Sequence, residues 1–164
     1  MGVPAVGSAA ADSGGHRITA QPDRDVLISH EGPEALATKI TKIRTDGEKA
    51  MATLDRLRTL CLTYPATSEA ASWGHPNFKA GKKVFVAFEH VKGRPSIAFR
   101  LAPADVERLL MRRQFFATPY GRGQWVSLWA DGAVDWKAVS DLVDRSYRVV
   151  AQKRMIAALD ARRV

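Results

Sequence analysis

The chain has 164 residues, of which 46% are hydrophobic and 26% are charged, as in an ordinary globular domain. Its single cysteine excludes an intramolecular disulfide framework and a cysteine-rich zinc site. No apolar run approaches the roughly 18 residues of a membrane-spanning helix, so we expect a cytoplasmic protein without a membrane partner. The 25 Lys and Arg outnumber the 17 Asp and Glu, giving a formal net charge of +8.

The first fifty residues differ in character from the rest. No aromatic residue occurs before Tyr64, and Met1 to Gly15 is composed mainly of small side chains. Such a segment buries too little apolar surface to offset the entropy lost on ordering. We therefore expect residues 1–47 to be mostly disordered. Within them, only Pro33 to Thr45 predicts a short, weak helix, because three apolar residues are spaced i, i+4 and i+7 there.

Met51 begins a segment, Met-Ala-Thr-Leu-Asp, that resembles the natural start of a protein. Residues 1–50 are therefore interpreted either as a dispensable extension or as the result of a misplaced start codon. They carry six basic and seven acidic side chains, which leaves 19 basic and 10 acidic ones in residues 51–164. The predicted folded domain, residues 51–164, is thus the basic part of the chain.

The first predicted elements are a helix and a hairpin. The pattern over Thr53 to Thr63 predicts a helix in which Cys61 is a small buried residue rather than a reactive thiol. After a turn at Gly81, Lys83 to Glu89 predicts a strand whose side chains alternate between two faces. A second strand is predicted over Ser96 to Leu101, and the two strands form an antiparallel hairpin.

The remainder predicts two further helices and two further strands. A helix begins at Pro103, a short strand covers Phe115 to Ala117, and another strand covers Gln124 to Ala130. Asp135 caps a last helix that runs to about Leu159. This order indicates an α+β two-layer sandwich, with helices packed on one face of an antiparallel sheet.

Several motifs of the predicted domain resemble the MmcQ/YjbR family. The likeness covers about residues 51–155. It rests on Trp73-Gly74-His75-Pro76-Asn77-Phe78-Lys79, on Lys82 and Lys83, on Tyr120-Gly121-Arg122-Gly123-Gln124-Trp125-Val126, and on the stretch from Asp141 to Tyr147. The resemblance implies a fold similar to the frataxin-like CyaY group. It also implies a double-wing DNA-binding protein, in which hairpins reach along the nucleic acid.

Non-enzymatic nucleic-acid binding is therefore the expected function, with DNA or another polyanion as partner. Lys and Arg beside hairpin glycines suit phosphate contacts that do not depend on base sequence. We expect these groups to form one continuous patch, with Trp125 or Trp129 as a stacking platform for bases. The candidate phosphate-binding residues are Lys82, Lys83, Lys92, Arg94, Arg100 and Arg122.

The main alternative is a module that binds a protein or a small ligand. Its candidate pocket consists of Trp73, His75, Tyr120 and Trp125. His75 is expected to brace its loop by hydrogen bonding. No motif of a known catalytic class occurs, and the first predicted helix lacks the acidic face of an iron-binding frataxin. We therefore expect no enzymatic activity, no metal and no cofactor, and a monomer.

Overall fold

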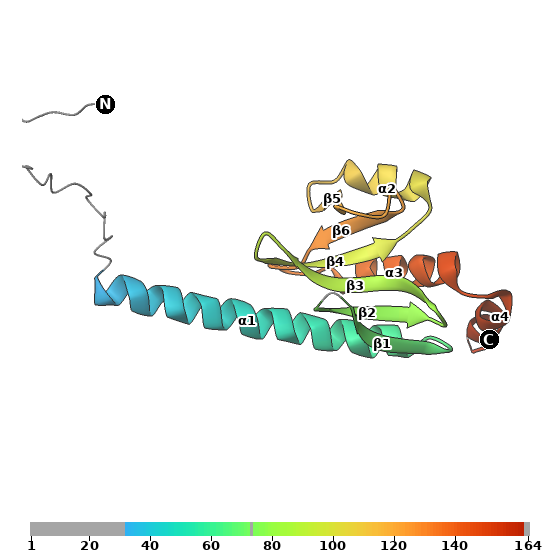
Figure 1. The fold of residues 1–164 in the computed structure, drawn as a ribbon, viewed down its shortest axis with the longest axis horizontal. Coiled ribbons are helices and arrows are strands. Elements are labelled where there is room, and N and C mark those ends of the chain that lie inside the picture. Colours follow the sequence, from blue (N-terminus) through green and yellow to red (C-terminus); the bar gives the residue numbers. More distant parts are fainter. Residues whose placement is uncertain (1–31, 73, 163–164) are drawn as a thin grey trace, which may run out of the picture.

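The structure is a computed structural model that describes residues 32–72 and 74–162. Within them the chain forms an α+β fold of four helices and a six-stranded sheet (Figure 1). The helices are α1 (Pro33–Leu62), α2 (Pro103–Leu110), α3 (Trp136–Val150) and α4 (Lys153–Ala161). The strands are β1 (Thr67–Ser72), β2 (His75–Ala80), β3 (Lys83–Val91), β4 (Arg94–Arg100), β5 (Phe115–Ala117) and β6 (Trp125–Trp129).

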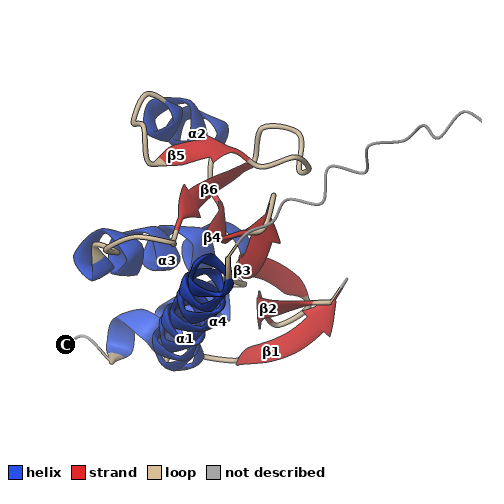
Figure 2. Ribbon diagram, turned by 90° about the vertical axis from the view of Figure 1, so that its left-hand side faces the viewer, coloured by secondary structure: helices blue, strands red, loops and turns tan. Residues whose placement is uncertain are grey.

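All neighbouring strands are antiparallel, in the order β1-β2-β3-β4-β6-β5. Helices α1, α3 and α4 lie on one side of the sheet and α2 lies beside the edge strand β5, whereas the loop between β5 and β6 extends toward the other side (Figure 2). The predicted two-layer α+β class and the predicted β3–β4 hairpin are confirmed. No helix of the described residues is long and apolar enough to cross a lipid bilayer.

A β-bulge in β3 changes which side chains face the helices. Phe78 is paired with Val86, whereas the next residue of β2, Lys79, is paired with Val84, so Phe85 is the extra residue. The Phe85 ring packs against the helix layer, at 5.7 Å from the ring centroid of Tyr147. The simple alternation predicted for this strand is therefore wrong. Because of the bulge, Val84 lies on the helix-free face beside Lys79.

The core lies between the sheet and the helices. Leu54, Leu57 and Cys61 of α1 are buried, and the thiol stays protonated because burial raises the pKa of Cys61. The expected role of Cys61 as a small buried residue is thus confirmed. The Tyr147 hydroxyl donates a hydrogen bond to the Pro65 carbonyl, 2.7 Å away, and ties α3 to the end of α1.

The first helix is much longer than predicted. The short helix expected over Pro33 to Thr45 forms, but it is the first half of the continuous helix α1. The disorder expected up to residue 47 is therefore wrong for residues 33–47, and the segment before residue 32 lies outside the described residues. Gly47 does not interrupt α1, whose second half is held by packing on the sheet. Met51 lies in the middle of this helix.

Two further boundaries also differ from the prediction. No strand is predicted between Thr63 and Lys83, yet β1 and β2 both lie there. The single helix predicted from Asp135 to about Leu159 is two helices in the structure. Helix α3 ends at Val150, because Ala151 has an extended backbone, and α4 follows it. The N-cap role of Asp135 is confirmed, since its side chain accepts hydrogen bonds from two backbone amides of α3.

One buried hydroxyl joins three elements of the fold. Ser146 of α3 is fully buried, and its Oγ accepts a hydrogen bond from the Arg100 backbone N–H at 2.9 Å. It lies within donor reach of the carbonyl oxygens of Phe85 and Arg100. Helix α3 is thereby tied to β3 and β4.

Replacement of Ser146 by alanine is expected to lower the free energy of unfolding by about 2 kcal/mol, because the Arg100 N–H loses this buried acceptor. Urea denaturation followed by circular dichroism measures the change. Ser140→Ala, on the same helix but only half-buried, is the control and should change stability by less than about 0.5 kcal/mol. Equal losses in the two variants would contradict the assigned role of Ser146.

Candidate functional site

The helix-free face of the sheet contains a groove with a volume of about 740 Å³. It follows β3, since its lining includes residues of that strand from Val84 to Val91 as well as Lys82 in the preceding turn. Strand β2 provides one wall, and the loop between β5 and β6 provides the other. The lining residues are Ser72, His75, Asn77, Lys79, Lys82, Val84, Glu89, His90, Val91, Pro119, Tyr120 and Trp125.

The β5–β6 loop, residues 118–124, is held over the sheet by specific contacts. Thr118 Oγ1 and Ser127 Oγ form a buried hydrogen bond of 2.8 Å. The Tyr120 hydroxyl donates a hydrogen bond to a Glu89 carboxylate oxygen, which connects the loop to β3 across β4. The Tyr120 ring lies edge-on to the Trp125 ring, with centroids 5.9 Å apart. These contacts fix the loop in place, and its Tyr120 ring together with Trp125 forms an aromatic wall of the groove.

The Tyr120–Glu89 contact also fixes the protonation state of the phenol. Burial raises the pKa of Tyr120, and the Glu89 carboxylate raises it further. The hydroxyl therefore remains a donor throughout the physiological pH range. Among the described residues that line the groove, Glu89 is the one carboxylate, and it accepts this hydrogen bond.

The opposite wall is formed by alternate residues of β2. His75, Asn77 and Lys79 all line the groove, whereas the intervening Phe78 is buried in the core. Asn77 Nδ2 donates to the His75 carbonyl at 2.9 Å and to the Ser72 carbonyl at 3.3 Å. These bonds close the β1–β2 turn, so Asn77 positions the wall.

The two lysines that line the groove are not paired with carboxylates, unlike many other cations of the domain. Lys79 and Lys82 make no ion pair within residues 32–72 and 74–162. In contrast, five arginines of the predicted domain are paired with carboxylates: Arg58, Arg94, Arg108, Arg145 and Arg148. The positive charge of the groove is therefore available to an anionic ligand.

The structure brings together three of the residues predicted for a pocket. His75, Tyr120 and Trp125 all line the groove, although they come from β2, the β5–β6 loop and β6. Trp73, the fourth predicted member, lies outside the described residues. His75 contributes its carbonyl to the Asn77 bond, and no hydrogen bond of its side chain is seen in the described part of the chain.

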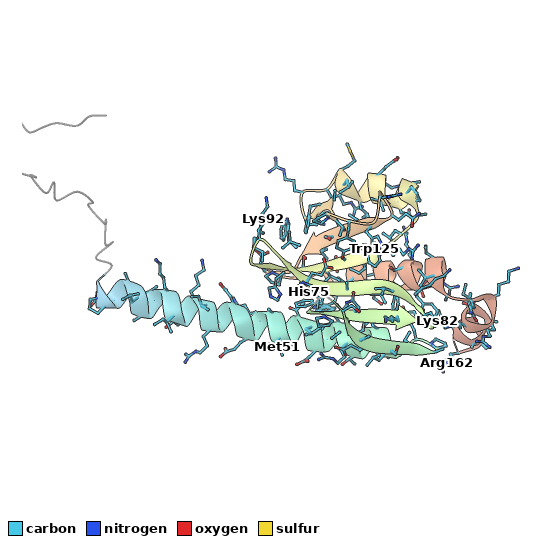
Figure 3. All side chains as sticks on the ribbon, viewed as in Figure 1. Met51, His75, Lys82, Lys92, Trp125 and Arg162 are labelled. Carbon is cyan, nitrogen blue, oxygen red and sulfur yellow. The ribbon has the colours of Figure 1, made fainter. Side chains whose placement is uncertain are left out.

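The predicted phosphate-binding residues form separate groups instead of one continuous patch. Lys82 and Lys83 lie at the start of β3, whereas Lys92 lies in the turn after its other end, roughly 30 Å away (Figure 3). Arg100 lies opposite Trp125 in the β4–β6 pair, and its Nη2 donates to Gln124 Oε1 at 3.2 Å. Arg122 lies in the β5–β6 loop.

Arg94 and Trp129 have partners that limit their predicted roles. Arg94 Nε lies 2.6 Å from Asp131 Oδ2, and its guanidinium covers the Trp129 ring at 4.0 Å from the ring centroid. Phe116 stacks on the same indole with centroids 4.0 Å apart, so the two groups must occupy opposite faces of the ring. Trp129 therefore offers no free face to a base, and the charge of Arg94 is offset by Asp131.

Sequence reasoning missed Lys79, Glu89 and His90 as members of the groove. In this part of the sequence the polar residues His75, Asn77 and Lys79 alternate with Pro76 and Phe78. This alternation is typical of a strand with one exposed face. No group of three or more His, Cys, Asp or Glu side chains within the described ranges is arranged to hold a metal ion.

A second cleft, of about 470 Å³, lies between α2 and α3. Its lining contains three arginines and three aspartates, and two of the arginines, Arg108 and Arg145, share Asp105 at 3.7 and 3.5 Å. A shared carboxylate offsets their charge, so this cleft is a weaker candidate for an anionic ligand than the groove on β3.

Comparisons with known proteins place the chain in a family. It is similar in structure to Deinococcus radiodurans protein DR2400, a DUF419 domain, with 18% identity, a TM-score of 0.53, and coverage of 65% of this chain and 87% of that one. It is also similar to a structural-genomics target from Pseudomonas syringae, with 14% identity, a TM-score of 0.47, and coverage of 51% and 86%. No curated protein matches the chain. The YjbR family model matches residues 62–149, just over half of the sequence, and the chain therefore belongs to the YjbR family.

Proposed function

We propose that the protein binds nucleic acid without acting on it chemically, and that a single strand lies in the groove along β3. The observation that carries this proposal is the course of the groove. It runs along β3 between two hairpin turns that carry lysines, the Gly81–Lys82 turn at one end and the Lys92–Gly93 turn at the other. A polyanion lying along β3 would meet cations at both ends.

The chemistry of the lining suits both parts of a nucleotide. Lys79 and Lys82 supply ammonium groups for phosphate, and the Trp125 and Tyr120 rings supply apolar surface for a base. Arg100 and Arg122, beside the aromatic wall, extend the basic surface toward the β5–β6 loop. None of these contacts requires a particular base, so we expect little sequence preference.

The test is the binding of the full chain to a fluorescent single-stranded oligonucleotide across a salt series. Each phosphate contact on a single strand should contribute a slope of about −0.7 in a plot of log affinity against log salt. We expect a slope between roughly −1.4 and −2.8, which corresponds to two to four contacts. Absence of binding at low salt, or affinity that does not respond to salt, would overturn the proposal.

The size of the groove favours one second candidate, a small anionic ligand with a planar ring. Its volume of about 740 Å³ is within the range of small-molecule sites. Thermal-shift measurements with nucleoside monophosphates and with oligonucleotides of increasing length separate the two functions. Stabilisation that increases with length supports the nucleic-acid function, whereas full stabilisation by a monophosphate supports the small-ligand function.

A further inference from the structure

The first half of α1 carries an apolar stripe that nothing in the described part of the chain covers. The N-terminal end of this helix projects past the strands (Figure 1), and residues 33–49 are roughly 25 Å long. Lys42, Asp46 and Lys49, which lie outside the apolar stripe, line a cleft with Arg94 and Asp131. Leu36, Ile40 and Ile43 lie on this segment with 49%, 65% and 71% of their surfaces exposed. Exposure of three large aliphatic side chains on one helical face is typical of a surface that associates with another chain.

The exposed stripe continues the face that the second half of α1 buries in the core. From Leu36 to Cys61 the face repeats with alternating spacings of four and three residues, through Ile40, Ile43, Gly47, Ala50, Leu54 and Leu57. This is the repeat of the apolar positions of a coiled coil. The last four members, from Ala50 to Cys61, are buried in this chain. Leu36, Ile40 and Ile43 therefore have the spacing of residues that pack against a second helix, but no second helix covers them in the described part of the chain.

We infer that a second copy of this chain supplies that helix, and that residues 33–49 of the two copies pair in antiparallel orientation. The orientation follows from the position of the core. In a parallel pair, both helices would present the same face to each other beyond Ala50, where each already packs on its own sheet. In an antiparallel pair centred between Ile40 and Ile43, the two folded bodies lie at opposite ends of the helix pair.

The charges that flank the stripe favour the same orientation. In heptad terms Lys39 and Asp46 occupy g positions, and Arg44 occupies an e position. A parallel pair would place Lys39 beside Arg44 of the second copy, which is repulsive. An antiparallel pair places Lys39 beside Asp46 of the second copy, twice by symmetry, which is attractive. Gly47 has open space around it and allows close approach of the second helix.

Sedimentation equilibrium tests this inference. The full chain is measured at protein concentrations from about 1 to about 200 µM, since small interfaces associate weakly. We expect the mass to increase from 18.0 kDa at the low end toward twice that value at the high end. A monomer mass throughout this range would overturn the inference. This result is independent of whether the chain binds nucleic acid.

Paired substitutions identify the surface. Ile40→Asp with Ile43→Asp should abolish the dimer, whereas Thr41→Asp with Lys42→Asp, on other faces of the same turn, should weaken it by less than about threefold. Dimers that survive the isoleucine change would show that another surface pairs, and would also overturn the inference.

A charge exchange tests the orientation. Lys39→Asp alone should weaken an antiparallel dimer by about tenfold, because two attractive contacts become repulsive. Addition of Asp46→Lys to the same chain should restore the affinity to within about threefold of the original. A dimer that tightens with Lys39→Asp alone would be parallel, since the introduced carboxylate would then face Arg44 of the second copy, and this result would contradict the antiparallel arrangement.

Discussion

Replacement of both Lys79 and Lys82 by glutamate is expected to lower the affinity for a single-stranded oligonucleotide about 100-fold at low salt. Each lysine is proposed to form a charge-assisted contact with phosphate, and such a contact contributes roughly 1.5 kcal/mol, or about tenfold in affinity. The slope of log affinity against log salt should also become shallower by about 1.4, which is the loss of two single-strand contacts. Fluorescence anisotropy across a salt series measures both quantities.

A matched control separates the groove from the net charge of the protein. Lys137 and Lys153 are exposed near the starts of α3 and α4, away from the groove lining. Glutamate is favourable near a helix N-terminus, so replacement of both should not unfold the protein. The control changes net charge by the same amount and should reduce affinity by less than about fivefold with an unchanged salt slope. Equal effects in both variants would show that the groove is not the binding surface.

The fold class was predictable because most elements carry a clear pattern of buried residues. The alternating sequence of β4 and of β6, Pro103 at the start of α2 and the Asp135 cap of α3 each lie within a single segment. Strands β1 and β2 were missed because Gly74 and Pro76 interrupt the segment and favour a loop. In the structure Gly74 occupies the turn with positive φ, and Pro76 lies on β2 opposite Ala71, near the end of the paired region.

The errors at helix ends and in β3 have tertiary causes. Gly47 costs about 1 kcal/mol in a helix, and only the packing of the residues after it shows that the helix continues through it. The end of α3 at Ala151 carries no glycine or proline signal, and the chain turns there so that Met155 and Leu159 of α4 reach the core. The bulge at Phe85 depends on the register with β2, which the sequence of β3 alone does not contain.

The candidate site was predictable in part for the same reason. His75, Tyr120 and Trp125 lie in motifs that mark them by residue type and by the glycines beside them. Arg94 was also chosen by residue type and by the glycine beside it. Its carboxylate partner Asp131 lies 37 residues further along the chain, so the sequence did not show that this positive charge is offset. Local sequence therefore identified candidate side chains, whereas only the sheet order showed which of them share one groove.

Gly121→Ala is expected to disrupt the aromatic wall of the groove and to lower oligonucleotide affinity about tenfold, within the range of one lost base-stacking contact. Gly121 has a φ of +84°, and a Cβ at this position would lie 2.0 Å from Cδ1 of Trp125. The clash must displace the indole or residues 118–124. Stability should also fall by about 2 kcal/mol, because a non-glycine residue in this backbone region costs roughly 1–2 kcal/mol before the clash is counted. Thermal unfolding and anisotropy on the same samples measure both effects.

Gly123→Ala provides a control with the same backbone strain and no clash. Its φ is +77°, yet a Cβ there would meet no atom within 4 Å. This variant should lose about 1–2 kcal/mol of stability but keep its affinity to within about twofold, since Trp125 and Tyr120 stay in place. The difference in affinity between the two variants thus isolates the position of the indole from the stability of the loop. If both variants bind as tightly as the original protein, the β5–β6 loop is not a wall of the binding site, and the bound strand must lie elsewhere on the sheet.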